Sequence, residues 1–213
     1  MLTPDQFFAF LAAAILLTLS PGPDNMMVLS LGMAKGRLRG IAFGLGCALG
    51  CLSHTLLAVA GVSALIAASP LAFGALKVCG GLYLAWLGVG ALRSRGGGAV
   101  GAVGESGAAG LAESPRRLFL KGVFANAINP KVALFFLSFL PQFVAAGRGD
   151  ANLQTALLGL AFTAQAAVLF GLLGWFSGSV GAWLNRRPRA GMWLDRCAGV
   201  VFIALGLRLI VAR

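Results

Sequence analysis

The sequence predicts an all-α integral membrane protein with six transmembrane helices, arranged as two inverted three-helix repeats in which the first and fourth helices are broken. Hydrophobic residues make up 59% of the chain and charged residues only 11%, and the mean hydropathy is +0.89. These values lie outside the range of soluble globular domains. Apolar segments long enough to span a bilayer recur along the chain, and prolines interrupt two of them at positions about half of the 213-residue chain apart.

Each predicted span is bounded by a turn signal, such as the basic stretch before Gly40 or Ser69-Pro70. The first span continues well past Asp24, so we interpret it as a retained helix and not as a cleaved signal. The fifth is long enough to tilt or to end in an interfacial turn. The predicted spans are residues 5–33, 41–67, 71–92, 118–145, 153–184 and 192–212.

A segment rich in Gly, Ala and Ser, residues 93–117, separates the third span from the fourth. Its composition predicts a flexible linker, because it offers little to bury. The linker divides the chain into a first three-helix repeat, residues 1–92, and a second, residues 118–213. Since three is odd, duplicated halves enter the membrane in opposite directions, as in the inverted repeats of secondary transporters.

Most of the 17 Lys and Arg residues lie in three short clusters between apolar segments. The clusters occupy the first, third and fifth connections, whereas the second and fourth connections contain only Arg148. Basic loops mark the cytoplasmic side of a membrane, so we expect the odd loops, including the linker, in the cytoplasm and both termini outside. The same distribution argues against a nucleic-acid surface, although the net charge is +11.

The two proline breaks are the strongest functional signal in the sequence. Ser20-Pro21-Gly22-Pro23-Asp24-Asn25 interrupts the first span and Asn129-Pro130-Lys131 the fourth. A broken helix is tolerated inside a bilayer only where protein or a cavity satisfies the freed backbone groups. We predict helix breaks at Pro21, Gly22, Pro23 and Pro130. Paired breaks in corresponding positions of two halves indicate the binding site of a transporter.

Asp24 and Lys131 each cost about 2.5 to 3.5 kcal/mol near the centre of a membrane helix, so each needs a partner. In one interpretation they pair with each other and join the two halves. In the other, a zwitterionic substrate bridges them, with its ammonium at Asp24 and its carboxylate at Lys131. We adopt the second as the working hypothesis, because direct pairing requires no broken helices.

Three amides and one histidine accompany these charges. Asn25, Asn126 and Asn129 are predicted to add hydrogen-bonding groups to the substrate site, with hydrogen bonds between helices as the alternative. His54, which is the only histidine, could relay protons together with Asp24, or could be a neutral ring bonded between helices.

The sequence lacks the motifs of an enzyme: it has no Gly-rich phosphate loop, no HExxH, and no nucleophile set beside a His and an acid. We therefore expect no catalytic residues, no metal site and no cofactor. The four cysteines lie in or beside apolar stretches without a carboxylate or histidine set to complete a ligand group, so we interpret them as packing residues.

Several motifs together resemble the LysE/RhtB family of amino-acid exporters, which includes lysine exporters and efflux proteins for homoserine and threonine. They are the Ser20 to Asn25 motif, Gly81-Leu82-Tyr83-Leu84-Ala85-Trp86-Leu87-Gly88, Asn126-Ala127-Ile128-Asn129-Pro130-Lys131, and Phe139-Leu140-Pro141-Gln142-Phe143. The resemblance covers essentially the whole chain. It implies a bacterial inner-membrane protein that exports amino acids or their derivatives by proton antiport. The implied partners are an amino-acid substrate, protons and the lipid bilayer, and a homo-oligomer remains an open alternative.

We expect an alternating-access mechanism in which the substrate is held between the two breaks. Two other functions stay open at this point: a membrane scaffold that does not transport, with the polar breaks binding a partner helix, and a passive channel. The substrate itself does not follow from the sequence.

Overall fold

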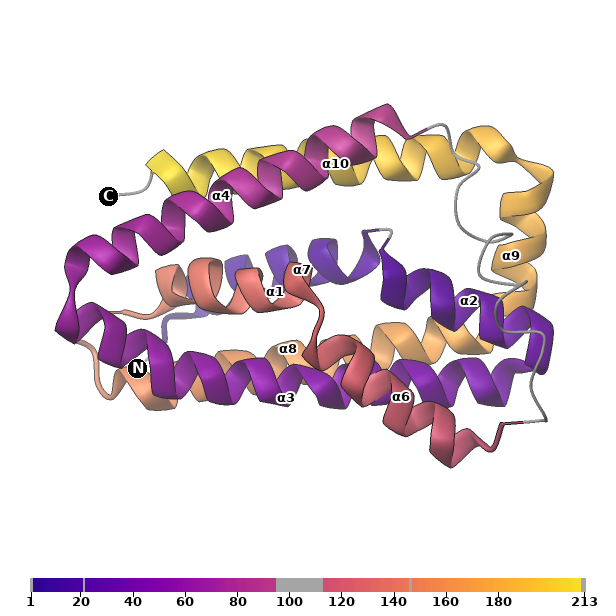
Figure 1. Cartoon of the computed structure of the whole chain (residues 1–213), viewed down its shortest axis with the longest axis horizontal. Helices are drawn as coiled ribbons and strands as arrows, with labels where there is room; N and C mark the ends of the chain where they lie inside the picture. Colours follow the sequence, from indigo (N-terminus) through magenta and orange to yellow (C-terminus); the bar gives the residue numbers. More distant parts are fainter. Residues whose placement is uncertain (1, 21, 95–112, 146, 212–213) are drawn as a thin grey trace.

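The structure, a computed structural model, describes residues 2–20, 22–94, 113–145 and 147–211. Every element in these residues is a helix (Figure 1). In chain order the elements are α1 (Pro4–Leu19), α2 (Pro23–Lys35), α3 (Arg37–Ala68), α4 (Pro70–Arg93), α6 (Pro115–Ala127), α7 (Pro130–Leu134), the π-helical η1 (Phe135–Phe139), the 3₁₀-helical η2 (Leu140–Phe143), α8 (Ala151–Trp175), α9 (Ser177–Arg186) and α10 (Pro188–Val211).

In the described residues, up to five segments are long enough and apolar enough to cross a membrane. Helices α3, α4 and α8 each do so alone, and two bent pairs do so if each pair is one span. The first pair, α1 and α2, bends by 55°, and the second, which begins with α6 and continues from Pro130 to Phe143, bends by 48°. The all-helical class is therefore confirmed. The sixth predicted span corresponds to α10, a 24-residue helix whose composition does not meet the same test.

Two of the predicted spans differ in detail from single helices. The fifth is divided into α8 and α9, with Phe176 between them, so the long apolar segment ends in a separate helix. The second half of the fourth passes from α-helix through π-helix to 3₁₀-helix before Val144. Pro141 lacks an N–H and so interrupts the regular hydrogen bonding of that segment.

The helices begin where local chemistry favours a start. Proline occupies the first turn of α1, α2, α6 and α7, where its missing N–H costs nothing. Thr3 and Gln6 form a capping box at the start of α1, and Asp150 accepts hydrogen bonds from the backbone of Asn152 and Leu153 at the start of α8. Of the predicted linker, residues 95–112 lie outside the described residues; α4 ends at Arg93 and α6 begins at Pro115.

Long helices from the two halves of the chain pack against each other in antiparallel pairs (Figure 1). In the pair α4 and α10, a Cβ at Gly81 would lie 2.8 Å from the carbonyl oxygen of Gly206, and one at Gly199 would lie 2.6 Å from that of Gly88. Small residues at such positions let helix backbones approach closely. In the pair α3 and α8, Gly159 lies against the side chain of Thr55, which a Cβ at Gly159 would overlap.

Helix α6 packs closely on α3 at two further glycines. A Cβ at Gly46 would lie 2.0 Å from the carbonyl oxygen of Phe119, and a Cβ at Gly122 would lie 2.1 Å from that of Phe43. The two halves of the sequence therefore interleave, because α3 of the first half packs on both α6 and α8 of the second. This interleaving brings the two proline breaks together.

The aromatic part of the core lies between the breaks and the end of the molecule at which α1 begins and α10 ends (Figure 1). Phe10 of α1 contacts Phe143 at a centroid distance of 5.5 Å, and Phe135 contacts Phe139 at 5.0 Å. All four side chains are buried. Offset and edge-to-face packing of this kind fills the interior on that side of the breaks.

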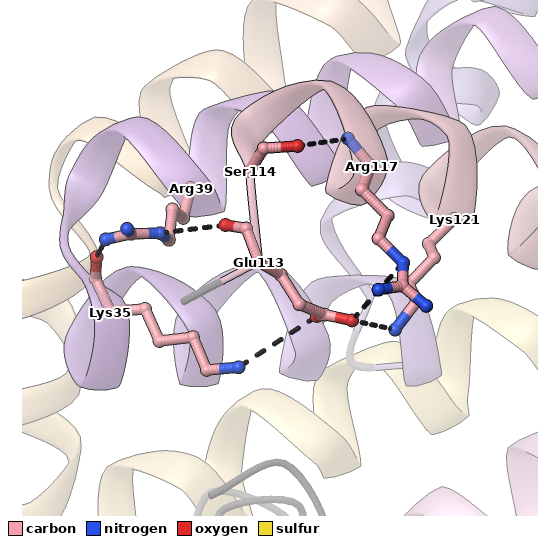
Figure 2. Close-up of polar contacts among 6 residues, drawn as sticks. All are labelled: Lys35, Arg39, Glu113, Ser114, Arg117 and Lys121. Carbon is pink, nitrogen blue, oxygen red and sulfur yellow. Dashed lines mark hydrogen bonds and ion pairs between the residues drawn. The ribbon is translucent and has the colours of Figure 1, made fainter. Parts of the chain in front are cut away.

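At the opposite end of the molecule, here called the basic end, the carboxylate of Glu113 lies among cations from two helices (Figure 2). Lys121 of α6 donates a hydrogen bond to it, and Arg117 Nε and Lys35 Nζ each lie 3.9 Å from one of its oxygens. The Nε of Arg39 also donates to the backbone carbonyl of Glu113, at 3.2 Å. Glu113 thus connects the start of α6 to the junction of α2 and α3.

Candidate functional site at the two helix breaks

The first break separates α1 from α2. Helix α1 ends at Leu19, and Ser20 adopts an extended conformation. Gly22 is the N-cap of α2 and Pro23 is its first residue; no side chain caps this end. Pro21 lies outside the described residues. Asp24 therefore stands in the first turn of α2, where the positive end of the helix dipole favours a carboxylate.

The second break separates α6 from α7. Asn129 is the N-cap of α7, and its Oδ1 accepts a hydrogen bond from the backbone N–H of Lys131 at 3.0 Å. Pro130 is the first residue of the helix, and Lys131 follows it. The break thus has the same order as the first one: a cap, a proline, and then a charged residue.

The carboxylate of Asp24 is bonded to the second break. Its Oδ2 accepts hydrogen bonds from Asn126 Nδ2 at 2.8 Å and from Asn129 Nδ2 at 3.0 Å. Asp24 is only 7% exposed, and both amides are buried as well. The side chain of an acidic residue in an apolar span is held here by two neutral donors from the other half of the chain.

The ammonium of Lys131 is bonded to the first break. Its Nζ donates to Ser20 Oγ at 2.6 Å and to the Ser20 carbonyl at 3.1 Å, which satisfies a backbone group freed by the break. The same nitrogen lies 5.1 Å from the centroid of the Phe202 ring in α10, within range of a cation–π contact. It also lies 3.3 Å from where a Cβ would be at Gly22.

Each break is therefore bonded to the charge of the other one. No ion pair in the described residues joins Asp24 to Lys131. The interpretation in which the two charges simply neutralise each other in direct contact does not describe this state. Both nevertheless line one cavity, together with Asn25, Asn126 and Asn129.

This cavity, here called the polar centre, has a volume of about 20 Å³. A water molecule needs about 10 to 15 Å³ of such space, so the polar centre has room for about one. A small organic molecule fits only if the surrounding helices separate. The wall is completed by Leu17, Thr18, Cys51, Val132, Phe162 and Phe170.

His54 is hydrogen-bonded to Asn126 and is not among the described residues that line the polar centre. Its Nε2 lies 2.9 Å from the backbone carbonyl of Asn126, and its ring packs on Phe136. Because a carbonyl oxygen can only accept, Nε2 carries the proton, and Nδ1 is left without a hydrogen-bond partner in the described residues. His54 therefore joins α3 to α6 and does not line the cavity.

Asn25, in the first turn of α2, forms a hydrogen bond across the first break to the end of α1. Its Nδ2 donates to the carbonyl of Thr18 at 2.8 Å, which satisfies the last turn of α1. Thr18 in turn accepts a hydrogen bond from Gln165 of α8 at 2.9 Å. The amide of Asn25 thus has a structural contact, although the residue lines the cavity.

Several residues of this site were not among those predicted from the sequence, and three of them contact its charged or amide groups. Ser20 holds the Lys131 ammonium, Cys51 donates from its thiol to Asn126 Oδ1 at 3.4 Å, and Phe202 approaches Lys131 from α10. Ser20 carried a usable signal, since it immediately precedes the first proline of the break. Cys51 and Phe202 carried none, because helix packing alone brings them to the polar centre.

A helical bundle with apolar spans, two broken helices and opposite charges buried at the breaks defines a polytopic membrane protein. The pattern of the LysE type translocator family matches residues 15–213. The chain therefore belongs to that family, and the resemblance seen in the motifs is confirmed. Because the members are translocators, the expectation that the chain is not an enzyme is confirmed too.

Bacterial relatives match the chain over nearly its full length. A leucine efflux protein of Enterobacter sp. (strain 638) is 31% identical, with 96% of this chain and 94% of the relative covered. A threonine efflux protein of Salmonella typhi is 30% identical, with coverage of 97% and 98%. An uncharacterized membrane protein of Pseudomonas aeruginosa is also 30% identical, with coverage of 97% and 95%. No solved structure matches.

Proposed function

We propose that this chain is a secondary transporter that exports amino acids or amino-acid derivatives across the bacterial inner membrane. Relatives at about 30% identity are named as efflux proteins for leucine and for threonine. The observation that carries the proposal is the polar centre: a carboxylate and an ammonium line one cavity without pairing with each other. Opposite charges held apart in this way are complementary to a zwitterion.

In this proposal the substrate replaces the contacts that each charge now makes. The substrate ammonium binds the Asp24 carboxylate beside Asn126 and Asn129. The substrate carboxylate binds the Lys131 ammonium, which leaves Ser20. Each charge now contacts only neutral groups, whereas the substrate would bring an opposite charge to each of them, so the exchange of partners adds the attraction between opposite charges.

The packing supports the inverted repeat, with 1–92 and 118–213 as its two units and α10 as the sixth span. Helices related by a twofold axis in the membrane plane run antiparallel, and α3 with α8 and α4 with α10 are such pairs. The basic residues around Glu113 lie at one end, and α1 begins and α10 ends at the other (Figure 1). We therefore place the basic end in the cytoplasm and both termini outside.

The transport cycle that we propose is alternating access coupled to protons. The polar centre has room for only about one water, so we propose that it opens to one side at a time through movement of the surrounding helices. The aromatic side chains around Phe10 and Phe135 close the outer path in the present state. We place the coupling proton on Asp24, because its carboxylate lines the cavity, and we give His54 the role of positioning Asn126.

Counterflow in proteoliposomes tests the function directly. Vesicles loaded with unlabelled amino acid are diluted into labelled amino acid, and a transporter accumulates label transiently and saturably. A scaffold gives no flux, and a passive channel gives flux without exchange, so either result contradicts the proposal.

The substitution Asp24→Asn keeps the shape of the side chain and removes its charge and its proton. We expect it to abolish proton-driven export while the protein remains folded in the membrane. Asp5→Asn makes the same chemical change in the exposed first turn of α1 and serves as the control. Normal export by the Asp24 variant would overturn the assignment of the site.

A further inference from the structure

A larger cavity lies beside the polar centre, between the end of α1, the start of α2, and helices α8 and α9. Its volume is about 290 Å³, compared with about 20 Å³ for the polar centre. We call it the apolar groove. The wall on the side of α8, α9 and the residue between them consists of Leu169, Phe170, Leu172, Leu173, Phe176 and Val180.

The apolar groove adjoins the polar centre. Thr18, Asn25 and Phe170 line both cavities, so these three residues lie at the boundary between the polar centre and the groove. From there the groove extends to Val180 in α9, which lies at the basic end (Figure 1). It therefore approaches the polar centre from the side opposite to the aromatic core around Phe10.

Most of the residues that line the groove are apolar. No residue that lines it carries a charge. Its two polar side chains, those of Thr18 and Asn25, already take part in hydrogen bonds: Thr18 Oγ accepts from Gln165, and Asn25 Nδ2 donates to the Thr18 carbonyl. A ligand group in the groove would therefore find hydrophobic contact and few free hydrogen-bonding partners.

We propose that the apolar groove holds the side chain of the transported molecule, and that the substrates are amino acids with apolar side chains. The inference rests on the proposed function, because it requires the zwitterionic end to bind at the polar centre. The groove lies at the small end of the volume range of ligand pockets, which matches a side chain better than a large ligand. A charged side chain would lose its hydration there without a partner.

Competition between amino acids in counterflow measures this preference. With wild-type protein in proteoliposomes, we expect labelled L-leucine to exchange with a KM lower than that of L-threonine by roughly tenfold to a hundredfold, the range for apolar-pocket discrimination. We expect no saturable exchange of L-lysine.

A variant that fills the groove provides the decisive comparison. Leu173→Trp should raise the KM for leucine by about tenfold or more while exchange of L-alanine, whose side chain is a single methyl group, continues. Val168→Trp places the same bulk on the same helix at a side chain that is 61% exposed and does not line the groove, and it should behave as wild type.

A second variant avoids the risk that tryptophan disturbs folding. Leu172 is 50% exposed, so Leu172→Thr should be accommodated, and it should reduce the preference for leucine over threonine. An unchanged preference in both folded variants would show that the groove does not contact substrate, which overturns the inference.

The two proposals fail differently. Exchange of threonine or lysine as efficiently as leucine by the wild type would overturn the apolar specificity and leave the amino-acid exporter intact. No exchange of any of the four amino acids, by protein shown to be folded, would overturn the proposed function and this inference with it.

Discussion

The charged side chains of the polar centre have neutral partners, whereas those of the basic end have partners of opposite charge. In the polar centre, Asp24 and Lys131 are buried and held by neutral groups: two amides for the carboxylate, a hydroxyl and a carbonyl for the ammonium. At the basic end, the carboxylate of Glu113 lies among three cations, of which Arg117 is 71% exposed (Figure 2).

The difference follows from the cost of desolvation. A buried ion that has lost its hydration must be satisfied by fixed hydrogen bonds, whereas an exposed ion pair competes with water and contributes at most about 1 kcal/mol. Neutral partners also leave the net charge of Asp24 and Lys131 available to a ligand. We therefore expect the polar centre to control binding, and the basic end to make a small, salt-dependent contribution to stability.

The largest expected effect comes from removing the buried cation. Lys131→Met retains the length of the side chain but gives the substrate carboxylate no partner, and truncating one member of a buried charge pair costs about 2 to 5 kcal/mol. That corresponds to a roughly thirtyfold or greater rise in KM in counterflow. Lys121→Met removes a cation at the basic end and should leave KM nearly unchanged. Equal losses in the two variants would contradict the comparison.

A smaller effect is expected from removing one amide at the polar centre. Asn126→Ala takes away a donor to Asp24 and the acceptor for Cys51, so the free energy of unfolding should fall by about 1 to 3 kcal/mol. Thermal unfolding in detergent measures the loss. If the effect acts through the carboxylate, adding Asp24→Asn should cost less than the sum of the two single changes. Additive losses would show that Asn126 stabilises the fold independently of Asp24.

At the basic end we expect only a minor change in stability. Glu113→Gln removes the ionic contacts with Lys35, Arg117 and Lys121. The Glu113 side chain is 16% exposed, but Arg117 and Lys121 are 71% and 51% exposed, and surface pairs with such partners are worth on the order of 1 kcal/mol or less. The difference from wild type should shrink as salt is raised, since mobile ions screen exposed charges. The loss caused by Asn126→Ala should persist at the same salt concentrations. A salt-independent effect at Glu113 would mean that its contacts are not mainly ionic.

The smallest expected effect is the pH dependence of the contribution that Glu113 makes to the stability of the folded state. The hydrogen bond from Lys121, together with the neighbouring cations, lowers the pKa of Glu113 below its ordinary value of 4.5. A carboxyl with a lowered pKa stabilises the folded state above the ordinary value, and the contribution is lost as the pH falls through the lowered one. The melting temperatures of wild type and Glu113→Gln should thus differ at neutral pH and converge well below pH 4.5. A constant difference would show that the charge of Glu113 is not involved.

Much of the fold could be predicted because it depends on local sequence. Apolar length defines the spans, and proline with its neighbouring cap defines the restarts at Pro23 and Pro130. The separate helix α9 and the π-helical η1 could not be placed in this way. No strong local signal marks Phe176 or Phe135 as a boundary, and packing against neighbouring helices sets their geometry.

For the candidate site, too, local sequence could select residues but could not assign the contacts between them. Asp24, Asn126, Asn129 and Lys131 could be selected because charges and amides are costly in apolar segments. Their partners could not be assigned, since direct pairing of Asp24 with Lys131 and bridging by a substrate were both consistent with the sequence, and the contacts with Asn126, Asn129 and Ser20 depend on packing.

By itself, the sequence determined the membrane class, the positions of the two breaks and the charge that follows each. The tertiary structure decided that each charge is bonded to the opposite break, that Ser20 and Phe202 join the site, and that an apolar groove adjoins it. The reason is physical: the cost of burying a charge is a property of the residue and its segment. Its partner depends on which helices the close contacts of Gly46, Gly122 and Gly159 bring together.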